Sequence, residues 1–108
     1  MYRILITDPA QQDIQAAHDW WCENRSAAEA GRWYLGIYHA IASLVELPER
    51  FPHAPESELL EQGIRQLNFG LGRQPTHRIV FAITEKEIVI LRIRHASQDD
   101  LHFSDASP

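Results

Sequence analysis

Two helix patterns that follow each other almost without a break are the strongest constraint on how this chain of 108 residues can fold. The first is predicted over residues 8–24, because Asp8 can cap a helix whose first position is Pro9, and Gln11 completes a capping box. Its apolar positions recur at helical spacing and form one stripe, which consists of Ala10, Ile14, Ala17 and Trp21.

The second helix pattern begins only a couple of residues later. Ser26 and Glu29 form another capping box, and the helical spacing of apolar residues continues to Pro48. Two amphipathic helices with so short a connection must fold back on each other as an antiparallel hairpin. The apolar positions of the second helix are Ala30, Trp33, Tyr34, Ile37, Ile41, Leu44 and Val45.

Strand patterns stand on both sides of the helical hairpin in the sequence. Residues 2–7 are β-branched and apolar, and three further strands are predicted over 64–71, 76–84 and 88–94. The polar residues 84–87 predict a tight turn between the last two strands. The predicted order of elements is therefore β-α-α-β-β-β.

The remaining segments are predicted to connect or follow these elements. Residues 49–62 contain two prolines and many polar side chains, which indicates a loop with one helical turn around 58–60. From about Gln98 the chain is a polar tail. Together the elements predict one α+β domain over residues 1–108, in which the helical hairpin packs on a small, mostly antiparallel sheet.

Charge is distributed unevenly along the chain. The formal net charge is −5, which taken alone argues against a protein that binds phosphate chains. However, residues 1–61 carry four arginines against ten acidic residues, whereas 62–98 carry six basic residues against two acidic ones. An anionic partner is therefore expected to approach the predicted sheet and not the helical hairpin.

Arginines of the predicted sheet are the candidate binding residues. Strict alternation in the last strand places Arg92 and Arg94 on one exposed face, about 7 Å apart along the strand. Guanidinium groups in such a row suit phosphates or carboxylates, and the alternative is that they pair with the acidic helices. The candidates for binding an anionic partner are Arg65, Arg73, Arg78, Arg92 and Arg94. The residues predicted on the opposite face of the last strand are Val89, Leu91 and Ile93.

The register of the last two strands follows from the turn between them. With Glu85 and Lys86 at its centre, Arg94 is expected to pair with His77. A slip of one residue would place Arg94 opposite Arg78, and this register is disfavoured because like charges would face each other. The sequence therefore predicts that Arg94 and Arg78 do not lie opposite each other.

Histidine and tryptophan residues supply the other candidates. His95 ends the last strand beside two arginines, where it suits either a general base or a surface hydrogen bond. His18 and Cys22 have a spacing that a metal could bridge, but a structural zinc needs four ligands, so no metal site is predicted. Trp20 and Trp21 are adjacent on a helix and cannot both face the core, so one of them is expected to contact solvent or a partner.

The order of elements and two short motifs carry a resemblance to a known family. Residues 78–81, Arg-Ile-Val-Phe, precede a strand that ends in 95–99, His-Ala-Ser-Gln-Asp, which is similar to the H-[GA]-x-[RK]-D ending of ParE-type proteins. Over nearly its whole length the chain resembles the RelE/ParE superfamily of type II toxin–antitoxin toxins. The resemblance implies a toxin that a small antitoxin protein holds inactive.

Two activities occur in that superfamily, and they imply different site residues. RelE-like members cleave messenger RNA on the ribosome, and for that activity the resemblance assigns catalytic roles to Arg78 and His95. Gln98 stands where the second arginine of these ribonucleases falls, their C-terminal tyrosine has no counterpart, and Lys86 is the only lysine. A ParE-like inhibitor of DNA gyrase is therefore favoured, with an mRNA endoribonuclease and a degenerate, binding-only member as alternatives.

Partners and location follow from the resemblance and the composition. The expected partners are a cognate antitoxin and DNA gyrase, or the ribosome and mRNA for the alternative, in a toxin–antitoxin hetero-oligomer without a cofactor. An acidic antitoxin segment is expected to cross the sheet near Arg92 and Arg94, and an apolar one to cover the exposed tryptophan. No apolar run approaches the roughly 20 residues of a membrane span, so a cytoplasmic protein is expected.

Overall fold

The elements of the structure follow the predicted order. The computed structural model describes residues 2–59 and 63–96, so the tail from Gln98 and the end of the predicted turn at Leu60 lie outside the described residues. The elements are β1 (Arg3–Ile6), α1 (Asp8–Asn24), α2 (Ala27–Ser43), the 3-10 helices η1 (Pro48–Arg50) and η2 (Pro55–Leu59), β2 (Arg65–Phe69), β3 (His77–Ile83) and β4 (Glu87–His95).

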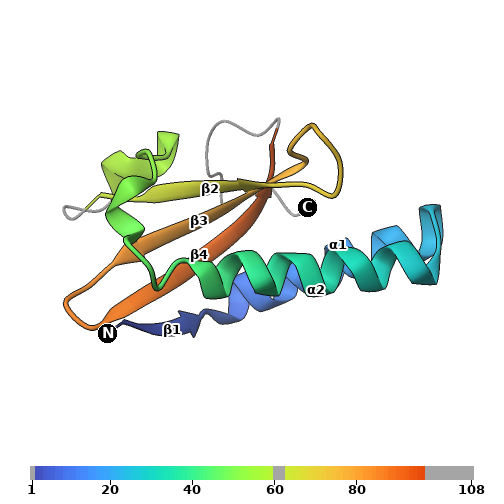
Figure 1. Cartoon of the computed structure of the whole chain (residues 1–108), viewed down its shortest axis with the longest axis horizontal. Helices are drawn as coiled ribbons and strands as arrows, with labels where there is room; N and C mark the ends of the chain where they lie inside the picture. Colours follow the sequence, from blue (N-terminus) through green and yellow to red (C-terminus); the bar gives the residue numbers. More distant parts are fainter. Residues whose placement is uncertain (1, 60–62, 97–108) are drawn as a thin grey trace.

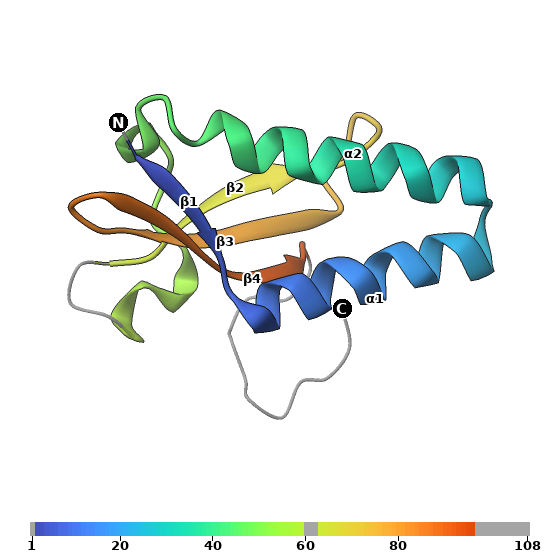
Figure 2. The ribbon, with the colours of Figure 1, turned by 90° about the horizontal axis from the view of Figure 1, so that it is seen from below.

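Two helices pack on one four-stranded sheet. The strand order is β1-β4-β3-β2, in which β1 runs parallel to β4 and the other pairs are antiparallel. Both helices lie along one side of the sheet (Figure 1). They run side by side in opposite directions, and their connected ends project beyond the strands (Figure 2). The predicted α+β class with a helical hairpin on a mostly antiparallel sheet is confirmed.

Helix ends are set by capping side chains, one of which differs from the prediction. The Ser26 hydroxyl accepts a hydrogen bond from the Glu29 N–H, as predicted. Thr7, and not Asp8, caps α1, since its hydroxyl accepts from the Ala10 N–H while Pro9 lies within the first turn. The second helix ends at Ser43 and does not reach Pro48.

The core lies between the helices and the sheet. The predicted stripes supply it, except that Tyr34 is 37% exposed and Trp21 is only partly buried. Leu67, Phe69 and Leu71 of the β2 region pack against it. Its buried residues are Ala10, Ile14, Ala17, Trp33, Ile37, Ile41, Leu44, Ile79, Phe81, Ile88, Ile90 and Ile93. A smaller cluster consists of Ala54, Ile64 and Val80, with Leu91 packed against it. Val80 stands between the core residues Ile79 and Phe81 in β3, so its side chain lies on the opposite face of the sheet.

A β-bulge in β4 overturns the predicted register. Pairing follows the turn as far as Phe81 opposite Ile90, and then Val80 pairs with Arg92, so that Leu91 is one residue extra. The Thr7 hydroxyl donates toward the carbonyl oxygens of Ile90 (2.8 Å) and Leu91 (3.1 Å) and so compensates for the interrupted ladder.

The bulge reverses the faces predicted for the end of β4. Beyond it Arg94 lies opposite Arg78, and His95 lies opposite His77. Ile93 joins Ile88 and Ile90 in the core beneath the helices, so the prediction that it shares a face with Val89 and Leu91 is wrong. The strict alternation on which that prediction rested fails at the inserted residue.

Candidate functional site

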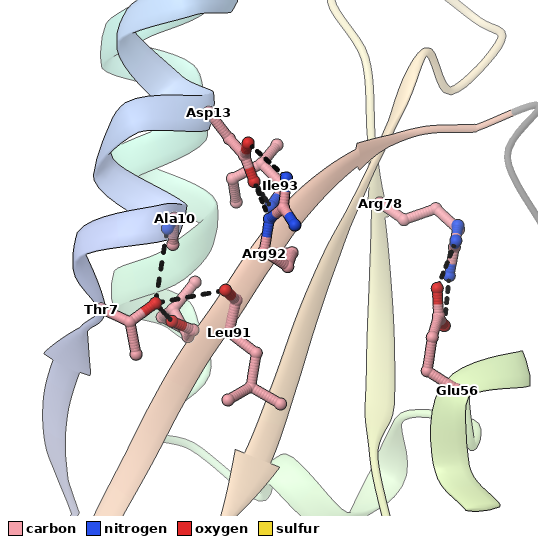
Figure 3. Close-up of polar contacts among 9 residues, drawn as sticks. Thr7, Ala10, Asp13, Glu56, Arg78, Leu91, Arg92 and Ile93 are labelled. Atoms are coloured by element: carbon pink, nitrogen blue, oxygen red, sulfur yellow. Dashed lines mark hydrogen bonds and ion pairs between the residues drawn. The ribbon is translucent and has the colours of Figure 1, made fainter. Parts of the chain in front are cut away.

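Arg78 is part of a buried ion pair and does not face solvent. Its two terminal nitrogens donate to the two carboxylate oxygens of Glu56 on η2, at 2.9 and 2.8 Å, and Gln66 accepts a further hydrogen bond at 3.0 Å. The Arg78 residue is 4% exposed and Glu56 is 3% exposed. Figure 3 shows the two side chains facing each other between β3 and η2. The charge conflict expected between Arg78 and Arg94 is reduced, because Glu56 neutralises the guanidinium group of Arg78.

Arg92 is held by a carboxylate of the first helix. Its Nε and one terminal nitrogen donate to Asp13 at 2.7 and 2.9 Å, and the same carboxylate accepts the backbone N–H of Ile93 at 2.9 Å. Figure 3 shows Asp13 on α1 reaching β4 where β1 has ended. Asp13 therefore has two roles: it accepts a hydrogen bond from a backbone N–H of β4 that β1 does not reach, and it neutralises Arg92.

The predicted row of exposed arginines does not form. Arg94 is 1% exposed. Arg65 donates from one terminal nitrogen to the carbonyl oxygens of Glu49 (3.0 Å) and Phe51 (2.6 Å), so it ties the loop to β2. Of the five candidates, Arg73 is the one that is exposed, in the bend between β2 and β3. The exposed positive face at Arg92 and Arg94 is therefore not present, and the position of an acidic antitoxin segment on it stays a prediction.

Two histidines meet at the end of the sheet. His95 is exposed at the end of β4, and its ring lies 5.5 Å from that of His77. His77 is 7% exposed, its Nδ1 is 2.8 Å from the Thr76 hydroxyl, and its ring lies 5.1 Å from Trp33. His77 was not among the predicted site residues, because the predicted register paired it with Arg94 and not with His95.

The free energy of unfolding is expected to fall when the pH is lowered from 7.5 to 5, because His77 is buried without charge in the folded protein. Burial lowers its pKa from the ordinary 6.5 to about 4, and His95 adds a smaller repulsion. Between these values the unfolded chain binds a proton that the folded protein does not, so unfolding should become about 2 kcal/mol easier between pH 7.5 and pH 5. Urea titrations at both values measure this difference. His77→Gln should remove most of this difference in unfolding free energy, whereas His39→Gln, at an exposed position of α2, should retain it. If the two variants show the same difference between pH 7.5 and pH 5, His77 is not its source.

A cavity of about 370 Å³ opens beside this histidine pair. Trp20 and Trp21 form one wall, with their rings edge to face at 5.6 Å. Trp20 is 46% exposed and Trp21 is partly buried, which confirms that one of the two tryptophans remains accessible. We call this cavity the Trp20 pocket; its lining residues are Ala17, Trp20, Trp21, Arg25, Thr76, His77 and His95.

The Trp20 pocket is lined by residues for which the sequence predicted unrelated roles. His95 and the two tryptophans were candidates for different roles, and the bulge together with the hairpin places them in one wall. Arg25 and Thr76 were not candidates, because only the fold places the end of α1 beside the start of β3. Aromatic walls with an arginine and a histidine at the opening suit the binding of an apolar group that carries negative charge.

The described parts of the chain contain neither a metal-binding cluster nor a helix that could span a membrane. Cys22 Sγ and His18 Nε2 are 4.0 Å apart, but within 2–59 and 63–96 no group of three or more His, Cys, Asp or Glu side chains could hold a metal ion. Neither helix over the same residues has the length and apolar character that crossing a bilayer requires.

Comparisons with known proteins agree with this architecture. One solved structure, described as the chromosomal ParDE TA system from P. aeruginosa, superimposes with a TM-score of 0.70 at 21% sequence identity, over 88% of this chain and 96% of that one. At this identity the likeness establishes the fold. No curated protein matches the sequence. The family model for the ParE toxin of the type II toxin–antitoxin system parDE matches residues 4–100. The chain therefore belongs to the ParE toxin family of type II toxin–antitoxin systems.

Proposed function

We propose that this toxin arrests growth by binding DNA gyrase and that a cognate antitoxin neutralises it within a toxin–antitoxin complex. Membership in the ParE toxin family supports this class of activity. The observation that favours gyrase over messenger RNA as the target is the buried ion pair of Arg78 with Glu56.

This ion pair weakens the ribonuclease alternative for a chemical reason. Cleavage of RNA by its own 2′-hydroxyl needs a base, an acid and positive charge at the phosphorane. The charge was assigned to Arg78, but its terminal nitrogens are occupied by Glu56. A phosphate that took their place would leave a buried carboxylate without its counterion, which is strongly unfavourable. His95 is exposed and could act as a base, but Arg78, the cation assigned to work with it, is buried in its ion pair with Glu56.

Gyrase inhibition is expected to be measurable with the purified protein. At micromolar concentration the toxin should suppress the ATP-dependent supercoiling of relaxed plasmid by gyrase, because it acts by binding and needs no other factor. Preincubation with the cognate antitoxin should restore supercoiling. Unchanged supercoiling at this concentration would eliminate gyrase as the target.

The two alternatives give different results. A ribonuclease would produce cuts in translated messages by primer extension, and these would disappear with His95→Ala. A degenerate member would leave the growth of an expressing strain unaffected while it still bound the antitoxin. We expect growth arrest without message cleavage.

A further inference from the structure

We propose that the Trp20 pocket is the docking site for an anchor segment of the antitoxin, in which a bulky apolar side chain stands next to a carboxylate. This inference rests on the antitoxin partner of the proposed function and is independent of gyrase. The walls of the pocket and the charge at its opening carry it.

The walls of the pocket are shaped to hold an apolar side chain. Its volume of about 370 Å³ lies near the lower end of the range for small-ligand sites, which suits one or two side chains better than an extended ligand. Trp20 offers an accessible ring next to Trp21. Tryptophan is enriched among the residues that contribute most to binding at protein interfaces, so an accessible tryptophan ring that lines a cavity suits contact with a partner's anchor residue.

The deep wall of the pocket is fixed by the core. His77 belongs to it, and the buried Trp33 stands against the His77 ring. His77 stays uncharged at neutral pH, because burial lowers its pKa to about 4. The inner part of the pocket is therefore rigid and neutral, which favours an apolar group over a charged one at this depth.

The charge at the opening selects the flanking residues of the anchor. Arg25 is exposed at the end of α1 and lines the pocket. Within residues 2–59 and 63–96, no ion pair or side-chain hydrogen bond holds its guanidinium group. Arg65, Arg78 and Arg92, by contrast, each have such partners. An available arginine next to an aromatic wall attracts carboxylates and repels cationic groups.

A peptide fits these observations better than a nucleic acid. Binding of a phosphate chain draws most of its strength from several basic side chains that act together. Here one available arginine stands on a helix that also carries the exposed acidic residues Asp19 and Glu23. One carboxylate next to an apolar anchor matches this charge, whereas a run of phosphates would meet repulsion from the helix.

The first experiment uses defined peptides and the intact chain. The acidic probe Ac-Gly-Gly-Phe-Glu-Gly-NH2, with one carboxylate next to one aromatic side chain, should shift the NMR signals of the Trp20 and Trp21 indole N–H groups of ¹⁵N-labelled protein. Replacement of its Phe by Ala, or of its Glu by Lys, should weaken binding about tenfold or more. Binding of uridine monophosphate as tight as that of the acidic peptide would overturn the proposal. So would peptide binding that appears only after residues 98–108 are removed, since the chain itself would then be the occupant.

The second experiment uses the cognate antitoxin and matched variants. Trp20→Ala and Arg25→Glu should each weaken the complex about tenfold or more in calorimetric titrations, because both side chains line the pocket. Circular dichroism of each variant checks that it remains folded. Arg32→Glu makes the same charge change at an exposed position of α2 outside the pocket and should leave affinity unchanged. Equal affinities for all three variants would overturn the proposal. If the toxin does not inhibit gyrase in the supercoiling test, the expected peptide and antitoxin affinities remain the same. The docking site and gyrase as the target can therefore be refuted independently.

Discussion

Replacement of Glu56 by alanine is expected to lower the free energy of unfolding by about 3–5 kcal/mol. Glu56 is the counterion of Arg78, and both side chains are almost fully removed from solvent. Attraction between two buried charges compensates for the loss of their hydration, and without Glu56 the guanidinium group keeps that loss alone. Urea titration with tryptophan fluorescence measures the difference.

Two controls separate the buried charge from other effects of this change. Arg3→Ala removes an exposed ion pair with Glu87, whose atoms are 3.8 Å apart, and should cost at most about 1 kcal/mol. The double variant Glu56→Leu, Arg78→Met removes both charges and should recover at least half of the loss, because no ion is then left uncompensated. A Glu56→Ala variant no less stable than Arg3→Ala would show that water reaches Arg78.

The helices and strands could be predicted because their signals are local. Ser26 and its partner three residues later fix the start of α2, and the apolar spacing that follows fixes the face of the helix. The two-residue connection then requires a hairpin. Thr7 was missed as the cap of α1 because Asp8 offers an equally good side chain, and the choice is made by the second role of Thr7 against β4.

The register of β4 could not be predicted because its cause lies outside the strand. The inserted residue Leu91 is accommodated by Thr7 and by Asp13, which are about eighty positions earlier in the chain. Nothing in the strand's own pattern marks this insertion. The extra residue brings Ile93 onto the core face with Ile88 and Ile90, whereas Arg78 and Arg92 are withdrawn from solvent by their ion pairs with Glu56 and Asp13.

The roles of the arginines depended on their partners in the same way. Arg78 is the first residue of a motif that resembles the toxin superfamily. Whether its guanidinium group can reach a ligand is decided by Glu56, in a loop for which the sequence predicted little structure. Composition and motif therefore indicated the family, whereas the tertiary contacts decide which side chains are available to a partner.

Trp33→Ala is the other substitution expected to cost about 3–5 kcal/mol of unfolding free energy, because it leaves a cavity in the middle of the core. Trp33 has no exposed surface, and its ring lies 6.4 Å from that of Phe69 and 5.1 Å from that of His77. Thermal or urea denaturation gives the value. Trp33→Phe keeps most of this packing and should cost no more than about 1.5 kcal/mol.

The comparison of these two variants also tests how the core supports the Trp20 pocket. In the described part of the chain the buried Nε1 of Trp33 has no hydrogen-bond partner, so phenylalanine removes a group that is costly to bury. Trp33→Phe should therefore retain binding of the acidic peptide, whereas Trp33→Ala should weaken it even under conditions where the variant is fully folded, because His77 loses the ring behind it. If both variants are equally unstable, a benzene ring cannot replace the packing of the Trp33 indole. Peptide binding retained by folded Trp33→Ala would show that the deep wall of the pocket does not depend on Trp33.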